Sequence, residues 1–255
     1  MATYLYCVLA PPNPEAIPNG LTGISGSPVR VLVPAATTHM EVWVATIDDA
    51  ALRVSGEALA RQALLHNDVV DAALATGRTP LPARFGSRFD DDATCLADVA
   101  RRSAVLSAIL DRVAGAVEMS VLIVPTGDFL ESIAPIAKPD RHEAAAGRRY
   151  LEVLRDRTRQ AEDQRQAAAS EAERLAKALS GIVSGESRSF RAIGLMSVAH
   201  LVPLEKVETY RYTLSRLEPG AGFRYVIGGP RGPYSFTGQN GDVGGHDSSS
   251  PNSNE

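Results

Sequence analysis

The sequence predicts an α+β protein made of two small α/β modules, the second of which carries a long helix. Short apolar runs bounded by glycine or proline, such as residues 4–9 and 117–124, are typical of strands. Longer segments with apolar residues three and four apart, at 55–75 and 90–114, are typical of helices. The segment 143–180 contains no proline and predicts one continuous helix.

Size and composition indicate a folded protein without a specialised environment. The 255 residues suffice for one large domain or two small ones, and 44% hydrophobic and 22% charged residues are ordinary for a globular chain. A formal net charge of −4 argues against a nucleic-acid partner. Cys7 and Cys95 are expected to be reduced, buried thiols. We find no secretory signal and no apolar run of about 20 residues, so we expect a cytosolic protein without a lipid-membrane partner.

The first module, residues 1–134, is expected to place helices on one face of a sheet. Residues 4–9 are apolar on both strand faces, which predicts a central strand, and 29–33 and 41–47 predict two more. Ser55 is the expected N-cap of the helix that ends near Gly77. Asp90, Asp91 and Asp92 are expected to begin the next helix, where carboxylates favour the positive end of the helix dipole. A strand at 117–124 completes the module.

The stretch 79–89 stands between the two helices and is expected to organise the module. The odd positions 81, 83, 85 and 89 are apolar, whereas Arg84 and Arg88 fall on even positions, which predicts a half-buried strand with its guanidinium groups on the outer face. Pro80 and Pro82 favour an edge strand, and Gly86 is expected to break it.

The second module, residues 140–236, follows a predicted boundary at 135–139. The long helix at 143–180 has alanine and polar residues in the middle of its seam, which leaves three possibilities: a partner helix, an intermolecular coiled coil or an exposed arm. A strand within 187–203, a helix at 204–217 and a strand at 223–227 are expected to follow. Residues 237–255 are rich in glycine, serine and asparagine and predict a disordered tail.

No catalytic or metal-binding motif stands out, so we expect no catalytic residue, no metal ligand and no cofactor. The five histidines lack metal-ligand spacing, and His66 and His200 lie on apolar faces where a core role is favoured. Asp90–Asp92 are not followed by a calcium-loop pattern. The segment Gly228–Phe236 lacks the lysine of a phosphate loop and is better explained as a rigid, aromatic terminal loop.

A set of short motifs occurs in an order that resembles a known family. These motifs are Tyr4-Leu5-Tyr6, His66-Asn67-Asp68-Val69-Val70, Leu81-Pro82-Ala83-Arg84-Phe85-Gly86, Tyr150-Leu151, Ala199-His200-Leu201-Val202, and Gly229-Pro230 with Pro233-Tyr234-Ser235-Phe236. Together they resemble the GvpL/GvpF family of gas vesicle proteins, over roughly residues 4–236. Arg231-Gly232 stands where this family usually has Trp-Pro, and Cys7 where a glycine is common.

The resemblance implies a non-enzymatic role in making the gas vesicle, a protein-walled, gas-filled compartment in the cytoplasm. It implies a minor vesicle component or assembly factor that associates with the small hydrophobic shell protein and with other accessory proteins. It also implies a modified ferredoxin-like fold for the first module and a long, coiled-coil-like helix for the second. The place of the protein, in the finished wall or only in assembly, is left open.

Three functional hypotheses follow. The first is a gas vesicle assembly protein that contacts partners through Arg84, Phe85, Tyr234 and Phe236, although Phe85 and Phe236 are equally explained as core residues. The second is a ferredoxin-like domain that binds a small molecule or metal at Arg84, Arg88 and Asp90–Asp92. The third is a scaffold that self-associates through the long helix.

Overall fold

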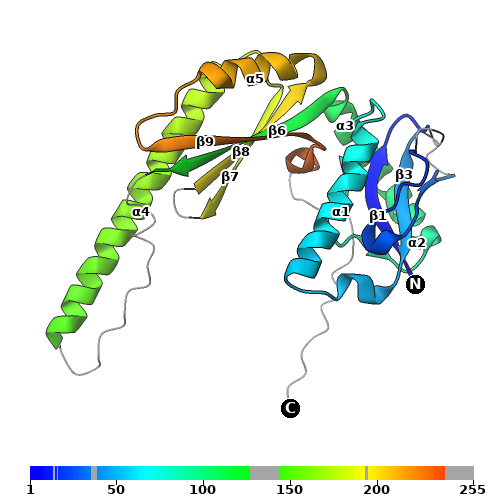
Figure 1. Ribbon diagram of the computed structural model, residues 1–255, viewed down its shortest axis with the longest axis horizontal. Coiled ribbons are helices and arrows are strands. Elements are labelled where there is room, and N and C mark those ends of the chain that lie inside the picture. Colours follow the sequence, from blue (N-terminus) through cyan, green and yellow to red (C-terminus); the bar gives the residue numbers. More distant parts are fainter. Residues whose placement is uncertain (14, 16, 36–38, 127–143, 193–194, 239–255) are drawn as a thin grey trace. The chain divides into compact units, whose positions relative to one another are not determined.

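The computed structural model describes residues 1–238 except 14, 16, 36–38, 127–143 and 193–194 (Figure 1). The chain forms two compact units, residues 1–118 together with the terminal segment that starts at Pro230, and residues 119–229. This division differs from the expected one, which placed all of 140–236 in one domain. The expected boundary at 135–139 and nearly all of the expected tail lie outside the described residues.

The first unit contains these elements: β1 (Ala2–Leu9), β2 (Val29–Leu32), β3 (Glu41–Ile47), α1 (Glu57–Leu74), β4 (Leu81–Pro82), β5 (Arg88–Phe89), α2 (Asp92–Arg101), α3 (Ser103–Val113) and the start of β6 (Ala116–Pro125). Its sheet has the order β2-β3-β1-β4, and β5 also pairs with β1. The pairings of β1 with β3, β4 and β5, and of β2 with β3, are antiparallel. Every residue of β1 is buried, which confirms the predicted central strand.

Helices cover both faces of this sheet, so the expectation of helices on one face is wrong. Neighbouring residues of a strand point to opposite faces. Tyr4 of β1 bonds to His66 of α1, whereas Thr3 donates to Asp92 of α2. The apolar character of β1 on both sides therefore reflects two packed faces, one against α1 and one against α2.

The stretch 79–89 forms two short strands instead of one. Leu81 and Pro82 form β4 at the edge of the sheet, and Arg88 and Phe89 form β5. Between them lies Gly86 with a φ of 94°, a left-handed conformation in which glycine is strongly preferred. The edge position, the break at Gly86 and the outward-facing arginines agree with the sequence prediction.

The helix boundaries differ from prediction in two places. The N-cap of α1 is Gly56, with a φ of 60°, and Ser55 does not cap it. The expected helix after Asp90 is divided at Arg102 into α2 and α3. Asp91 caps α2 by accepting the Thr94 N–H at 2.7 Å, which confirms a capping role within the Asp90–Asp92 run.

The second unit contains the remainder of β6, then α4 (Ala144–Ala178), β7 (Gly185–Ala192), β8 (Leu195–Pro203), α5 (Val207–Arg216) and most of β9 (Phe223–Arg231). The order of its sheet is β7-β8-β6-β9. Glu186 and Arg188 of β7 pair with His200 and Val198 of β8, so these four side chains share one face. On that face, Arg188 pairs with Glu173 of α4, and His200 bonds to Tyr210 of α5. Both helices therefore lie on the same face of the sheet.

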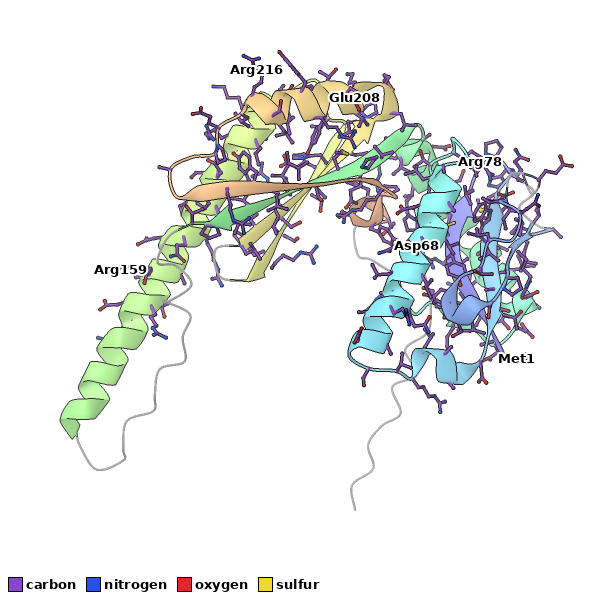
Figure 2. All side chains as sticks on the ribbon, in the orientation of Figure 1. Met1, Asp68, Arg78, Arg159, Glu208 and Arg216 are labelled. Atoms are coloured by element: carbon purple, nitrogen blue, oxygen red, sulfur yellow. The ribbon has the colours of Figure 1, made fainter. Side chains whose placement is uncertain are left out.

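The long helix α4 agrees closely with the predicted span. Its C-terminal half packs through Ala168, Ala172 and Leu175, which are fully buried, as is Leu179 directly after the helix. Arg159, labelled in Figure 2, is exposed, as are most described residues before Ala168. Among the residues from Arg155 onward, whose side chains the structure describes, the helix is buried mainly from Ala168 on.

Candidate functional site: the terminal segment and the His66 cluster

The most distinctive site in the described residues is the place where Pro230–Thr237 packs on the first unit. Within this segment, Tyr234–Phe236 form a 3₁₀ turn. Pro233 and Phe236 are buried, and Gly232 lies so close to α1 and β4 that a Cβ there would stand 2.7 Å from Val70 Cγ1 and 3.0 Å from Pro82 Cγ. Only glycine fits at position 232 without displacing these neighbours.

Glu118 is the anchor of the terminal segment. Its carboxylate is fully buried near the start of β6, in a run that is otherwise mainly apolar. Oε1 accepts from Arg231 Nη2 at 2.7 Å, from Arg231 Nε at 3.1 Å and from Ser235 Oγ at 3.1 Å. Oε2 accepts from the Ser235 backbone N–H at 2.7 Å. Because a buried carboxylate without partners is strongly destabilising, these bonds make Glu118 depend on the terminal segment.

Two further contacts hold the segment beyond Glu118. Tyr234 Oη donates to Asn67 Oδ1 of α1 at 2.8 Å. Arg112 of α3 donates to the Phe236 carbonyl oxygen. The segment is therefore bound by side chains from α1, α3 and β6. We name the surface formed by Asn67, Val70, Pro82, Arg112 and Glu118 the terminal-segment groove.

His66 of α1 joins β1 to the turn after β4. The Ala83 carbonyl can only accept, so His66 Nε2, 3.1 Å away, carries the proton and donates to it. Nδ1 is then unprotonated and accepts from Tyr4 Oη at 2.9 Å. Tyr4 Oη in turn accepts the Gly86 N–H at 3.0 Å. This chain of hydrogen bonds requires a neutral His66.

Burial controls the protonation of this cluster. It lowers the pKa of His66 from 6.5 to about 4, against a smaller opposite effect of the bond to Ala83. Burial likewise raises the pKa of Tyr6 to about 12 and raises the pKa values of Tyr4 and Tyr234. All four groups are consequently neutral at physiological pH, as expected of structural residues in an apolar core.

The rings of four separate sequence motifs meet around His66. Tyr4, Phe85 and Tyr234 have ring centroids 5.7, 5.9 and 6.3 Å from the His66 ring. Tyr6 lies 5.6 Å from it and accepts the Ile24 N–H at 2.9 Å. We name Tyr4, Tyr6, His66, Phe85 and Tyr234 the His66 cluster. Motifs separated by more than two hundred residues along the chain therefore form one packed structure.

The structure places the four predicted contact residues in different environments. Arg84 is exposed on the turn between β4 and β5, and Phe85 is half-buried against His66. Tyr234 is half-buried in the His66 cluster, and Phe236 is 9% exposed. Phe85 and Tyr234 both pack on the main core of the first unit. Sequence reasoning missed Glu118 and its partner Arg231; the available signal was one glutamate inside the mainly apolar run 116–124.

Two aspartates of the hypothesised anion or metal site bind other groups of the chain. Asp91 is the α2 cap, and Asp92 accepts from Arg30 Nη1 and Nη2 at 2.7 Å and from Thr3 Oγ1 at 2.6 Å. An open hollow of about 360 Å³ beside these aspartates is lined by Arg30, Thr3 and Thr46, among others, and not by Arg84 or Arg88. In the part of the chain that the structure describes, no three His, Cys, Asp or Glu side chains gather to hold a metal.

Comparisons with known proteins identify relatives of the whole chain. The profile of the gas vesicle synthesis protein GvpL/GvpF family matches residues 2–238. The crystal structure of gas vesicle protein GvpF from Anabaena sp. PCC7120 is similar with a TM-score of 0.65 and 18% identity, covering 96% of this chain and 99% of that one. The crystal structure of gas vesicle protein GvpF from Microcystis aeruginosa is similar with a TM-score of 0.63 and 17% identity, covering 93% of this chain and 99% of that one. No curated protein matches significantly. Among the described helices, none has the length and hydrophobicity needed to cross a membrane.

Proposed function

Because this chain belongs to the gas vesicle synthesis protein GvpL/GvpF family, we propose that it is a minor structural or assembly protein of gas vesicles that binds the small hydrophobic shell protein and accessory proteins. The single observation that carries this proposal is the family match over residues 2–238, which covers both units of the fold. The similarity to two GvpF crystal structures over more than nine-tenths of the chain supports the fold. The protein would act in the cytoplasm, at the growing vesicle.

We propose a non-enzymatic role for the buried polar groups. His66 and Glu118 are the kind of buried titratable residues from which active sites are built. In this chain both residues form hydrogen bonds within the protein. His66 bonds to Tyr4 and to the Ala83 carbonyl, and Glu118 bonds to Arg231 and Ser235. These bonds fix the fold around Arg84 and give the protein a stable surface for partners.

The proposed partner surface is centred on Arg84. Phe85, Tyr234 and Phe236 support it from inside, because Phe85 and Tyr234 pack on His66 and Phe236 closes the terminal turn. An apolar shell protein also needs apolar contacts before it assembles. The second unit offers Phe190 on β7 and Val226 and Ile227 on β9, which are 48%, 43% and 44% exposed.

We further propose that the first unit is a modified ferredoxin-like fold and that α4 pairs with another helix. The order β2-β3-β1-β4 with antiparallel neighbours is what a ferredoxin-like sheet requires, with an irregular segment in place of the first crossover helix. For α4, support comes from Arg165, an exposed residue of the seam that lies three positions before the buried Ala168.

Co-expression with the shell protein tests this function. The tagged chain should retain the shell protein on an affinity column, and Arg84→Glu should reduce the amount retained by about tenfold if Arg84 lies at the contact. Arg61→Glu is the matched control, because Arg61 is an exposed arginine on α1 of the same unit. Equal retention by both variants would remove Arg84 from the contact, and no retention by the wild type would refute direct binding.

A further inference from the structure

We propose that the terminal-segment groove is a peptide-recognition site and that residues 230–237 of a second copy of this chain can occupy it in exchange for the chain's own segment. The proposal rests on the groove and the segment alone and does not depend on the gas vesicle role. Both partners of every contact belong to the first unit. The chemistry of the groove thus defines the occupant: an arginine, a glycine, a proline and an aromatic-Ser-Phe turn.

The groove requires an occupant because of Glu118. Its carboxylate is fully buried, and among the described residues its hydrogen-bond donors are Arg231 and Ser235 of the segment. Removing the segment would leave a buried charge without a hydrogen-bond donor, a strongly unfavourable state. Any segment that leaves must therefore be replaced, and a second copy supplies the same donors.

The groove is also selective for this segment. Val70 and Pro82 leave no room for a Cβ at position 232, so glycine is required one position after the arginine. Asn67 Oδ1 accepts a hydrogen bond from the hydroxyl group of Tyr234, which follows Pro233. Charge, size and hydroxyl position together exclude most unrelated peptides, whereas an identical chain satisfies all three.

The segment is joined to the rest of its chain through two glycines. Gly228 and Gly229 precede it within β9, and Gly229 has a φ of 101°. Because glycine adopts backbone conformations that other residues avoid, the chain can change direction at this pair at low cost. Exchange of a terminal element through such a hinge reproduces every native contact between copies and is a common route to dimers.

A charge-exchange experiment in the full chain tests the proposal. The Glu118→Arg variant has two arginines in its own groove, and the Arg231→Glu variant has two glutamates. When the two variants are mixed, the groove of each copy can pair with a segment of opposite charge from the other copy. The two variants carry different tags and are refolded together. The amount of one variant that co-purifies with the other should be about tenfold higher than for two differently tagged copies of the same variant. Light scattering should give twice the mass of one chain. The double variant Glu118→Arg/Arg231→Glu can pair within one chain and serves as the folding control.

Failure of the pair to co-purify, when the double variant folds, would overturn the proposal. Because arginine at a buried position can prevent folding altogether, differently tagged wild-type chains refolded together at high concentration give a second test. They should co-purify, and Arg231→Ala in both chains should abolish this. Co-purification that persists in Arg231→Ala would arise from another surface, such as α4, and would also refute exchange.

Discussion

At the scale of single residues, His66 explains why several weak sequence motifs occur together. Tyr4, Ala83, Phe85, Gly86 and Tyr234 each contact this residue or the tyrosine bonded to it. The Tyr4-Leu5-Tyr6 motif of β1, the histidine of α1 and the Ala-Arg-Phe-Gly turn are therefore parts of one packed structure, which is joined by hydrogen bonds and ring contacts.

Tyr4→Phe should destabilise the first unit by about 1–3 kcal/mol, because it leaves His66 Nδ1 buried without a partner and removes the acceptor of the Gly86 N–H. The free energy of unfolding in urea, followed by fluorescence of Trp43, measures this change. Tyr212→Phe is the control, because Tyr212 is 62% exposed and should change stability by less than about 0.5 kcal/mol. Equal effects of the two substitutions would contradict a structural role for the Tyr4 hydroxyl.

His66 should also make stability depend on pH. Its pKa is about 4 in the folded chain and near 6.5 when unfolded, so between these values the unfolded chain binds the additional proton. Stability is then lost as the pH falls from about 6.5 towards 4, by at most about 1.4 kcal/mol per pH unit. His66→Gln should remove this part of the slope between pH 6 and 5 in urea unfolding. Parallel slopes for the two proteins would show that His66 is not buried in its neutral form.

The sequence allowed this site to be predicted only in part. The exposed Arg84, the inward Phe85 and the break at Gly86 follow from a two-residue alternation, which is a local property. The bonds of Glu118 to Arg231 and Ser235 join positions 113 and 117 residues apart. No local pattern specifies such a pair, because the partner of a buried charge is chosen by tertiary structure.

At the scale of elements, the turn between β4 and β5 depends on one glycine. Gly86→Ala should cost about 1–2 kcal/mol, because a φ of 94° is unfavourable for a residue with a Cβ. No atom lies within 4 Å of the added Cβ, so the cost is conformational and not steric. Gly86→Asn should cost less, because asparagine tolerates left-handed conformations better than alanine. Thermal unfolding of the three proteins checks this order, and a more stable alanine variant would refute it.

The attachment of α4 depends on Glu171, whose carboxylate accepts from Arg174 Nε at 3.0 Å, from the Gly220 N–H at 2.8 Å and from Tyr225 Oη. Burial raises the pKa of this carboxyl, but these bonds outweigh burial and bring the pKa down to about 2. Glu171→Gln should therefore destabilise the second unit by about 1–3 kcal/mol. Amide hydrogen exchange in residues 168–178 and 218–225 should become faster.

Glu173→Gln is the matched control for Glu171→Gln on the same helix. Glu173 is 71% exposed and pairs with Arg188, which also bonds to Glu186. An exposed ion pair of this kind contributes about 0–1 kcal/mol to stability, so Glu173→Gln should change the rate of amide hydrogen exchange little. Faster exchange in the Glu173 variant than in the Glu171 variant would contradict the assignment of Glu171 as the residue that fixes the helix.

At the scale of the whole molecule, the elements were more predictable than their arrangement. The limits of β1, β3, β6 and α4 follow from periodicity and from proline and glycine positions, and agree with the structure within a few residues. The covering of both faces of the first sheet and the separate strand β7 were not predicted, because they depend on which segments meet. The return of the terminal segment to the first unit is likewise a tertiary property.

Because the terminal segment packs on the first unit, we expect its contacts to contribute to the free energy of unfolding of that unit. A chain that ends at Gly229 lacks every donor to Glu118 named above and uncovers the core against which Tyr234 packs. Leaving a buried charge unpaired costs about 3–5 kcal/mol, so the first unit should unfold at a lower urea concentration. Trp43, the only tryptophan of the chain, is fully buried in this unit and reports its unfolding by fluorescence.

A chain that ends at Gly238 keeps the whole terminal segment and is the matched control for the chain that ends at Gly229. Its Trp43 transition should coincide with that of the full-length protein, because every contact of residues 230–237 remains. A shared transition for all three proteins would show that the first unit folds without the segment. A shift in the control as large as in the shorter chain would assign the effect to the residues after 238. Only a shift confined to the shorter chain supports Glu118 and the terminal segment as the link between the two ends.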